Sequence, residues 1–190
     1  MTRTLTPLIP PGPSLLTVED CLELPNDGKR YEIIEGDLYE TPAPVPYHQM
    51  VSNRLQTALI LALQRTGRGE VLNAPIGVIL DRHTVVQPDL IFIRRERAAL
   101  IGETAVNGPP DLVVEILSPS TRRTDLTAKS RVYARFEVES YWIVDPRKRR
   151  LELYRRNREQ FRLVATQQPP ETVCPDELPG LQIPLSEIFP

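Results

Sequence analysis

The chain has 190 residues, of which 41% are hydrophobic and 25% charged, and its formal net charge is −2. These values are typical of one soluble globular domain with a sizeable core, and the net charge argues against a protein that coats nucleic acid. The sequence lacks an apolar run of about 18 residues, so no membrane span is expected. Its start does not resemble a signal peptide, and two cysteines are too few for a metal cluster, so we expect a cytoplasmic protein with reduced thiols.

Charge is distributed unevenly along the chain. Residues 120–162 contain 13 Lys and Arg against 6 Asp and Glu, whereas residues 1–40 contain 3 against 8. The basic segment could face phosphate groups, and a solvated basic hairpin without a partner explains it equally well.

The N-terminal part begins with a proline-rich segment. Residues 1–14 are expected to form a flexible N-terminus, and residues 15–190 a single domain. Ser14 or Thr17 could cap a short helix, because acidic residues follow at the positions of its first turn.

The next two elements have clear patterns. Residues 31–35 and 38–40 flank Gly36-Asp37, which predicts a β-hairpin with a two-residue turn. Residues 47–65 place apolar side chains along one stripe at helical spacing, which predicts a long amphipathic helix.

The rest of the chain alternates between predicted strands and helices, and ends in a proline-rich tail whose apolar residues should pack back onto the body. We predict strands over 76–80, 85–93, 111–119 and 140–145, a short helix over 94–100, a helix from Thr124 or Asp125 to about 136, and a hairpin over 151–154 and 160–164. This order predicts an α/β or α+β fold with a mixed sheet flanked by helices.

Two acidic residues interrupt strands that should be buried. Asp89 and Glu115 lie in runs of Val, Ile and Leu, where a carboxylate is costly unless a cation or hydrogen bonds satisfy it. Mg²⁺ typically uses one or two carboxylates together with water and phosphate. With Lys129 on the following helix, these acids form a minimal set for metal-assisted phosphodiester hydrolysis, in which the metal activates water and the lysine orients it.

Three further side chains allow two interpretations each. Lys129 shares the apolar face of its helix, so it could simply extend its ammonium to solvent. His48 lies on the core stripe of the long helix, where it could be a core residue, a support for a metal site or a phosphate contact. Glu35 could be a third carboxylate of the site or an exposed strand charge.

Several segments together resemble a known family. They are Gln87–Leu90, Pro110–Thr121, Asp125, Lys129, Tyr133 and Glu139–Pro146. This set resembles the Uma-type family of putative restriction endonucleases, a bacterial domain of unknown function within the PD-(D/E)XK nuclease superfamily. The resemblance extends over about residues 17–164, and it implies a restriction-endonuclease-like mixed sheet with the metal site where strands diverge.

The resemblance assigns the superfamily's two acids to Asp89 and Glu115, which would hold Mg²⁺ or Mn²⁺. The lysine of the superfamily motif is replaced here by Leu117, and the resemblance implies that Lys129 supplies the amine instead. A second departure is Glu137, where family members commonly carry glycine before the following strand.

The resemblance also implies supporting residues. Glu35 and His48 would complete the catalytic site, with Ser118 and Asp125 as weaker supporting candidates. The implied function is a metal-dependent DNA endonuclease that acts as a homodimer.

Five basic residues are our candidates for contacts with the DNA backbone: Arg122, Arg123, Arg131, Lys148 and Arg149. The alternative is a catalytically silent module that binds nucleic acid or protein on the same fold, since no segment dedicated to reading bases is evident. That alternative would gain if Lys129 pointed to bulk solvent or if the proline-rich tail sealed the cleft.

Overall fold

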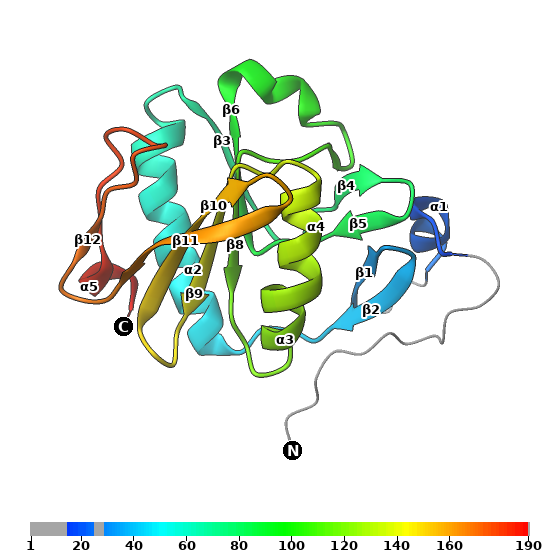
Figure 1. Cartoon of the computed structure of the whole chain (residues 1–190), viewed down its shortest axis with the longest axis horizontal. Coiled ribbons are helices and arrows are strands. Elements are labelled where there is room, and N and C mark those ends of the chain that lie inside the picture. The colour runs from blue at the N-terminus through cyan, green and yellow to red at the C-terminus, as the bar shows by residue number, and fades with distance from the viewer. Residues whose placement is uncertain (1–14, 25–28, 190) are drawn as a thin grey trace.

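The computed structural model describes residues 15–24 and 29–189 (Figure 1). The predicted flexible segment 1–14 and the alternative helix cap at Ser14 lie outside the described residues. Thr17 caps the first helix, and its side chain and that of Asp20 form a reciprocal capping box.

The described residues form short strands and helices throughout. The strands are β1 (Arg30–Ile34), β2 (Asp37–Thr41), β3 (Gly69–Asn73), β4 (Val78–Asp81), β5 (Thr84–Val86), β6 (Leu90–Arg94), β7 (Val106–Asn107), β8 (Leu112–Ile116), β9 (Ser140–Asp145), β10 (Arg150–Asn157), β11 (Gln160–Gln167), β12 (Thr172–Val173) and β13 (Ile183–Pro184). The helices are α1 (Val18–Leu22), α2 (Pro46–Leu59) with a π-helical turn η1 (Ile60–Gln64), the 3₁₀ helix η2 (Arg95–Leu100), α3 (Arg122–Thr124), the π-helical turn η3 (Asp125–Lys129), α4 (Ser130–Arg135) and α5 (Leu185–Ile188).

Two larger sheets organise the domain. The first has the strand order β11-β10-β9-β8-β6-β3 and the second the order β2-β1-β5-β4-β7, while β12 and β13 form a separate pair. Within the first sheet only β8 and β9 run parallel, and the helical segment α3-η3-α4 makes the crossover between them. The predicted mixed sheet flanked by helices is confirmed.

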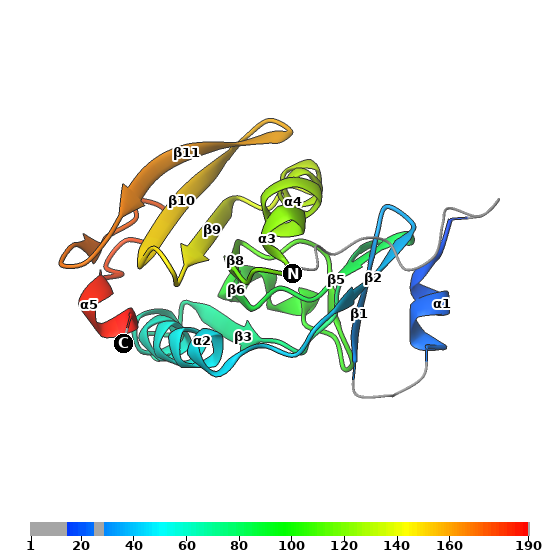
Figure 2. The ribbon, with the colours of Figure 1, turned by 90° about the horizontal axis from the view of Figure 1, so that it is seen from below.

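The two faces of the first sheet are covered by different helices, as Figure 2 shows for β6 and β8 between α2 and α4. Because successive strand residues point to opposite faces, Leu112 and Val114 of β8 join the core beneath α2. Val113 and Leu117 join the core beneath α4. Glu115 has the same parity as Val113, so it faces α4.

The predicted strand over residues 85–93 is interrupted in the structure. Its first part is β5 in the second sheet, and its second part is β6 in the first sheet. Pro88 lies at the break, where it cannot donate to a strand ladder. Asp89 therefore lies in the connection between the two sheets, immediately before β6.

The first hairpin turns one residue earlier than predicted. Ile34 pairs with Asp37, so the two turn residues are Glu35 and Gly36, with φ angles of 54° and 87°. A turn with positive φ at both central positions matches the twist of a hairpin. The shift places Glu35 at the tip of the hairpin, outside the strand.

The helix before β9 begins earlier than predicted. Thr121 is its N-cap residue. Thr124 and Asp125, the predicted caps, lie within the helical segment, and their side chains are buried in the protein. The Thr121 N–H is bound instead by the Ser118 hydroxyl at 3.2 Å. This hydrogen bond satisfies one backbone donor at the start of the helical segment.

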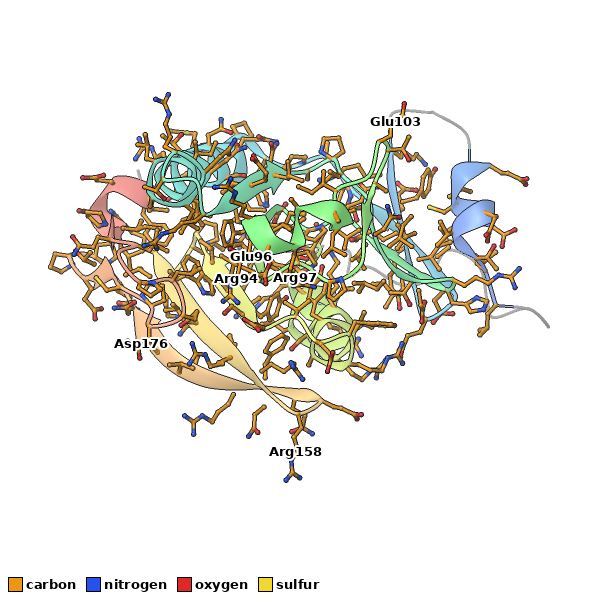
Figure 3. All side chains as sticks on the ribbon, turned by 90° about the horizontal axis from the view of Figure 1, so that it is seen from above. Arg94, Glu96, Arg97, Glu103, Arg158 and Asp176 are labelled. Carbon is orange, nitrogen blue, oxygen red and sulfur yellow. The ribbon has the colours of Figure 1, made fainter. Side chains whose placement is uncertain are left out.

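The C-terminal tail packs onto the body as predicted. Its apolar side chains, including Leu181 and Leu185, belong to the core beneath α2, and α5 lies against α2 (Figure 1). The β10–β11 hairpin is longer than predicted, and Arg158 projects from its tip (Figure 3).

Replacing Leu181 with alanine should therefore destabilise the whole domain. Its side chain is 1% exposed, and loss of a buried leucine typically costs about 2–5 kcal/mol in the free energy of unfolding. Urea denaturation followed by circular dichroism measures this, with Leu163→Ala on an exposed position of β11 as the matched control. If both variants unfold at the same urea concentration, the tail is not part of the core.

Candidate active site

Asp89 and Glu115 approach each other because of strand register. Leu90 of β6 pairs with Val114 of β8, and the next positions in this antiparallel register are Asp89 and Glu115. The Ile116 N–H donates to Asp89 Oδ2 at 2.8 Å. Glu115 is 3% exposed, so the structure brings the two predicted acids together at a nearly buried position.

Lys129, on the adjacent helical segment, holds Glu115, the second predicted acid. Its Nζ lies 3.2 Å from Glu115 Oε1, and the Tyr133 hydroxyl donates to the same oxygen at 2.8 Å. Lys129 is buried, so the interpretation of an ammonium extended to solvent is wrong.

A third carboxylate, Glu32 of β1, also lies in the cluster, although it was not among the predicted site residues. Its Oε1 accepts from Lys129 Nζ at 2.8 Å and from the Gln87 N–H at 2.6 Å. Thr41 Oγ1 donates to Oε2 at 3.0 Å. Glu32 is 1% exposed. The available signal was a charge that interrupts the apolar residues of a predicted strand.

Glu35 is not brought into this cluster, contrary to the prediction. It lies in the turn after β1, where its backbone has a φ angle of 54°, so its side chain does not follow the face of the strand that carries Glu32. Glu35 forms ion pairs with Arg131 and Arg135 on the exposed side of α4. These pairs hold the hairpin tip against the helix.

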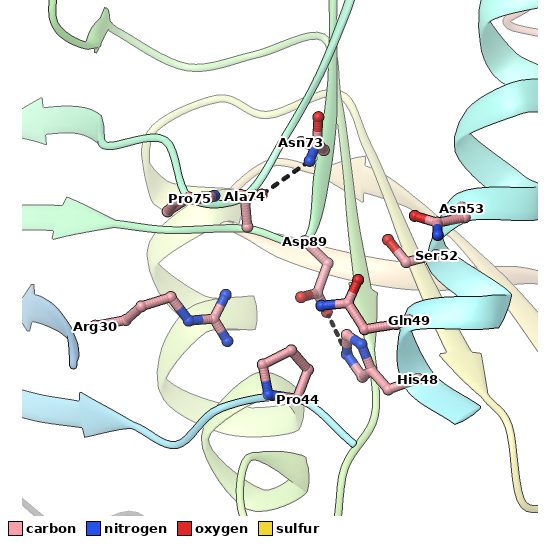
Figure 4. Close-up of a pocket in the computed structure, with 10 residues that line it drawn as sticks. All are labelled: Arg30, Pro44, His48, Gln49, Ser52, Asn53, Asn73, Ala74, Pro75 and Asp89. Carbon is pink, nitrogen blue, oxygen red and sulfur yellow. Dashed lines mark hydrogen bonds and ion pairs between the residues drawn. The ribbon is translucent and has the colours of Figure 1, made fainter. Parts of the chain in front are cut away.

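His48 contacts the other predicted acid. From the first turn of α2, its Nε2 lies 3.2 Å from Asp89 Oδ2 (Figure 4). Burial by itself would lower the pKa of His48, but the hydrogen bond and the charge of Asp89 outweigh it and raise the pKa. His48 therefore fixes the orientation of Asp89 and partly balances its charge.

Asp125 joins the cluster from within the helix. Its Oδ1 lies 3.7 Å from Lys129 Nζ and has no hydrogen-bond partner among the described residues. Burial raises its pKa to about 7, although Lys129 opposes this. Its backbone carbonyl accepts from the Tyr141 hydroxyl at 2.8 Å. Ser118, the other weaker candidate, contacts Ser120 and Thr121 instead.

The cluster contains more acidic groups than basic ones. Burial raises the pKa of Glu115 well above its usual value, with Lys129 opposing it. Burial would lower the pKa of Lys129, but Glu115 and the two further carboxylates hold it well above the usual value. One ammonium thus serves three buried carboxylates: Glu32, Glu115 and Asp125.

A divalent cation suits this excess of acidic groups, because a nearby positive charge favours the ionised form of a carboxyl group. Among the described residues, no three His, Cys, Asp or Glu side chains are arranged to enclose a metal by themselves. Mg²⁺ does not need such an enclosure, because it usually keeps several waters beside one or two carboxylates. Lys129 and Tyr133 both donate to Oε1 of Glu115. Asp89 and Glu115 therefore fit a two-carboxylate Mg²⁺ site.

The basic candidates for DNA contacts lie in two regions. Arg122, Arg123, Lys148 and Arg149 lie around the start of the helical segment, and Arg131 lies near the hairpin tip. Arg122 pairs with Asp145 at 2.8 Å, which ties the start of the helical segment to the turn that carries Lys148 and Arg149. Arg123 is exposed on the same helical segment, whereas Arg131 is engaged with Glu35.

A comparison with protein families finds a match over most of the chain. The model of the Uma2 family, described as "Putative restriction endonuclease", matches residues 18–186. No curated protein matches the chain.

A solved structure shares the fold. It is described as a putative nuclease belonging to DUF820 from Anabaena variabilis ATCC 29413, and it aligns with a TM-score of 0.75. The alignment covers 92% of this chain and 97% of the other at 18% identity. Among the described residues, no helix is long and apolar enough to cross a bilayer.

The buried cluster predicts a pH-dependent cost for replacing Lys129 with methionine. Removing one partner from a buried ion pair costs about 3–5 kcal/mol, and we expect a loss of this size near pH 8. In the native protein the pKa values of Glu115 and Asp125 are already raised, and without Lys129 they should rise further. The folded variant then binds more protons than the unfolded chain, so its stability should fall as pH rises from about 5 to 8.

Urea unfolding of Lys129→Met at both pH values measures this effect. The control is Lys29→Met, which removes an ion pair with Glu40 whose side chains are 49% and 32% exposed, and it should cost at most about 1 kcal/mol. Equal losses in the two variants near pH 8 would contradict the role of Lys129.

Proposed function

The chain belongs to the Uma2 family of putative restriction endonucleases, and we propose that it is a metal-dependent endonuclease that hydrolyses phosphodiester bonds of DNA. The observation that carries the proposal is the meeting of Asp89 and Glu115 in one strand register, with Lys129 anchored on Glu115 at 3.2 Å. Two carboxylates on adjacent strand positions and an amine beside one of them are groups that can serve metal-assisted phosphoryl transfer.

Each residue of the cluster has a distinct task in this proposal. Asp89 and Glu115 would hold Mg²⁺ or Mn²⁺, which supplies Lewis-acid polarisation of the phosphoryl group and lowers the pKa of a bound water. The Ile116 N–H and His48 fix Asp89 from two sides. Lys129 and Tyr133 fix Glu115 in the same way.

Glu32 and Asp125 act on Lys129. Together with Glu115 they keep the ammonium protonated and restrict its position. A fixed cation stabilises negative charge that develops nearby without the cost of reorienting solvent.

Two features weigh against the alternative of a catalytically silent module. Lys129 is buried against Glu115 and does not point to bulk solvent. A cavity of about 150 Å³ reaches Asp89, and its lining contains no residue of the proline-rich tail. Asp89 is therefore accessible to a substrate.

A homodimer is part of the same proposal. A double-strand break needs two cuts, and a pair of identical sites related by two-fold symmetry can make both. We expect sedimentation velocity of the protein with duplex DNA to give the mass of two chains. A single chain bound to the duplex, with nicks in only one strand, would contradict this part.

Cleavage should require both acids and the metal. We expect the protein to convert supercoiled plasmid to nicked or linear forms with Mg²⁺ or Mn²⁺, and Asp89→Asn or Glu115→Gln to reduce the rate by about a hundredfold or more. The matched control is Glu103→Gln, which carries the same change on an exposed loop (Figure 3) and should retain the full rate.

Two results would contradict the proposal. One is the absence of cleavage with either metal, and the other is cleavage that persists in both Asp89→Asn and Glu115→Gln. Thermal unfolding of each variant checks that a lost activity does not reflect a lost fold.

A further inference from the structure

The cavity beside Asp89 is larger than one water molecule, and Arg30, which has no part in the carboxylate cluster, lines it. It lies between β1, the first half of α2 and the connection from β3 to β4, and its volume is about 150 Å³ (Figure 4). A water molecule occupies about 30 Å³ of the liquid, so the space accommodates a group larger than one water. Asp89 and His48 line one side and Arg30 another.

Arg30 reaches this cavity because of strand alternation. It lies two positions before Glu32 on β1, so both side chains leave the same face of the strand. Glu32 enters the carboxylate cluster, whereas Figure 4 shows the Arg30 guanidinium directed toward Asp89 across the cavity. β1 thus supplies Glu32 to the carboxylate cluster and Arg30 to the adjacent cavity.

The Arg30 guanidinium has no counter-ion in the described part of the chain. Its Nε is buried without a hydrogen-bond partner, and no carboxylate of the described residues lies within 4.0 Å of it. A guanidinium is always charged and presents a rigid fork of donors. A buried donor without a partner is costly, so this position favours an anionic ligand.

The other polar residues at the cavity do not compete for this role. Gln49, Ser52, Asn53 and Asn73 are uncharged. His48 is occupied by Asp89 through Nε2, and its buried Nδ1 has no partner among the described residues. Arg30 is therefore the permanent cation among the residues that line the cavity.

We propose that Arg30 binds a phosphate group of the nucleic-acid substrate in this cavity, next to the phosphodiester bond that Asp89 and Glu115 act on. This inference rests on the proposed function. The guanidinium fork matches two phosphate oxygens, and its positive charge offsets the repulsion between the substrate and the acidic cluster. Arg30 is thus a substrate-positioning residue contributed by the second sheet.

The experiment measures binding separately from cleavage. Fluorescence anisotropy of a short labelled DNA duplex is recorded with Mg²⁺ in a Glu115→Gln background, so that the duplex is bound and not cut. Arg30→Gln should raise the Kd by about tenfold or more, as expected for a charged hydrogen bond. It should also make the slope of log K against log salt shallower by about one, which a purely structural defect would not do.

Two variants serve as controls. Arg30→Lys keeps the charge without the fork, so its Kd should lie between those of the arginine and glutamine forms. Arg65→Gln makes the same change at an exposed residue just after η1, and it should leave both the Kd and the salt slope unchanged. Isothermal titration with inorganic phosphate shows whether a free phosphate suffices or a nucleic-acid strand is needed.

The outcomes separate this inference from the proposed function. Loss of duplex binding in Arg30→Gln, in a protein whose native form does not cut plasmid, supports the phosphate site and contradicts only the nuclease. Cleavage by the native form, with an unchanged Kd and salt slope in Arg30→Gln, overturns the phosphate site and leaves the nuclease intact. Absence of binding to both duplex and inorganic phosphate also overturns it.

Discussion

The structure depends on one buried ammonium, that of Lys129, and the three carboxylates around it. Glu32 comes from the second sheet, Glu115 from the first, and Asp125 from the helical segment that also carries Lys129. Each carboxylate would be costly in this position alone, and the ammonium would be equally costly without them. The cluster therefore fixes how the two sheets and the helix meet, and it does so where Asp89 enters the first sheet.

The junction between the sheets explains why a site can form here. The chain leaves the second sheet after β5 and enters the first at β6, and Pro88 prevents one continuous ladder. Asp89 lies in this break, held by the Ile116 N–H and by His48, with one side on the cavity. Glu115, which is nearly buried on β8, and Asp89, which reaches the cavity from the break, thus lie at one location. Arg30 reaches the same location from β1, which places a cation beside an otherwise acidic site.

Much of the site could be predicted from local patterns in the sequence. Asp89 and Glu115 stand out because charges interrupt apolar strands, and the family resemblance identified Lys129 as their partner. Glu32 has the same local signature, but the resemblance implied Glu35, which lies at the hairpin tip and outside the cluster. The turn at Glu35 and Gly36 is set by the pairing of Ile34 with Asp37.

The sequence by itself determined the element order, the mixed sheet, the packing of the tail and the two acids, because these follow from hydrophobic periodicity and from the cost of buried charge. Only the tertiary structure decided that Lys129 is buried rather than extended to solvent, since this depends on carboxylates that arrive from three separate elements. The tertiary structure also decided that Glu32 joins the cluster and that Arg30 approaches Asp89, because both contacts depend on how the second sheet lies against the first. Contacts between residues far apart in the chain leave no periodic signal, so they emerge only when the sheets are assembled.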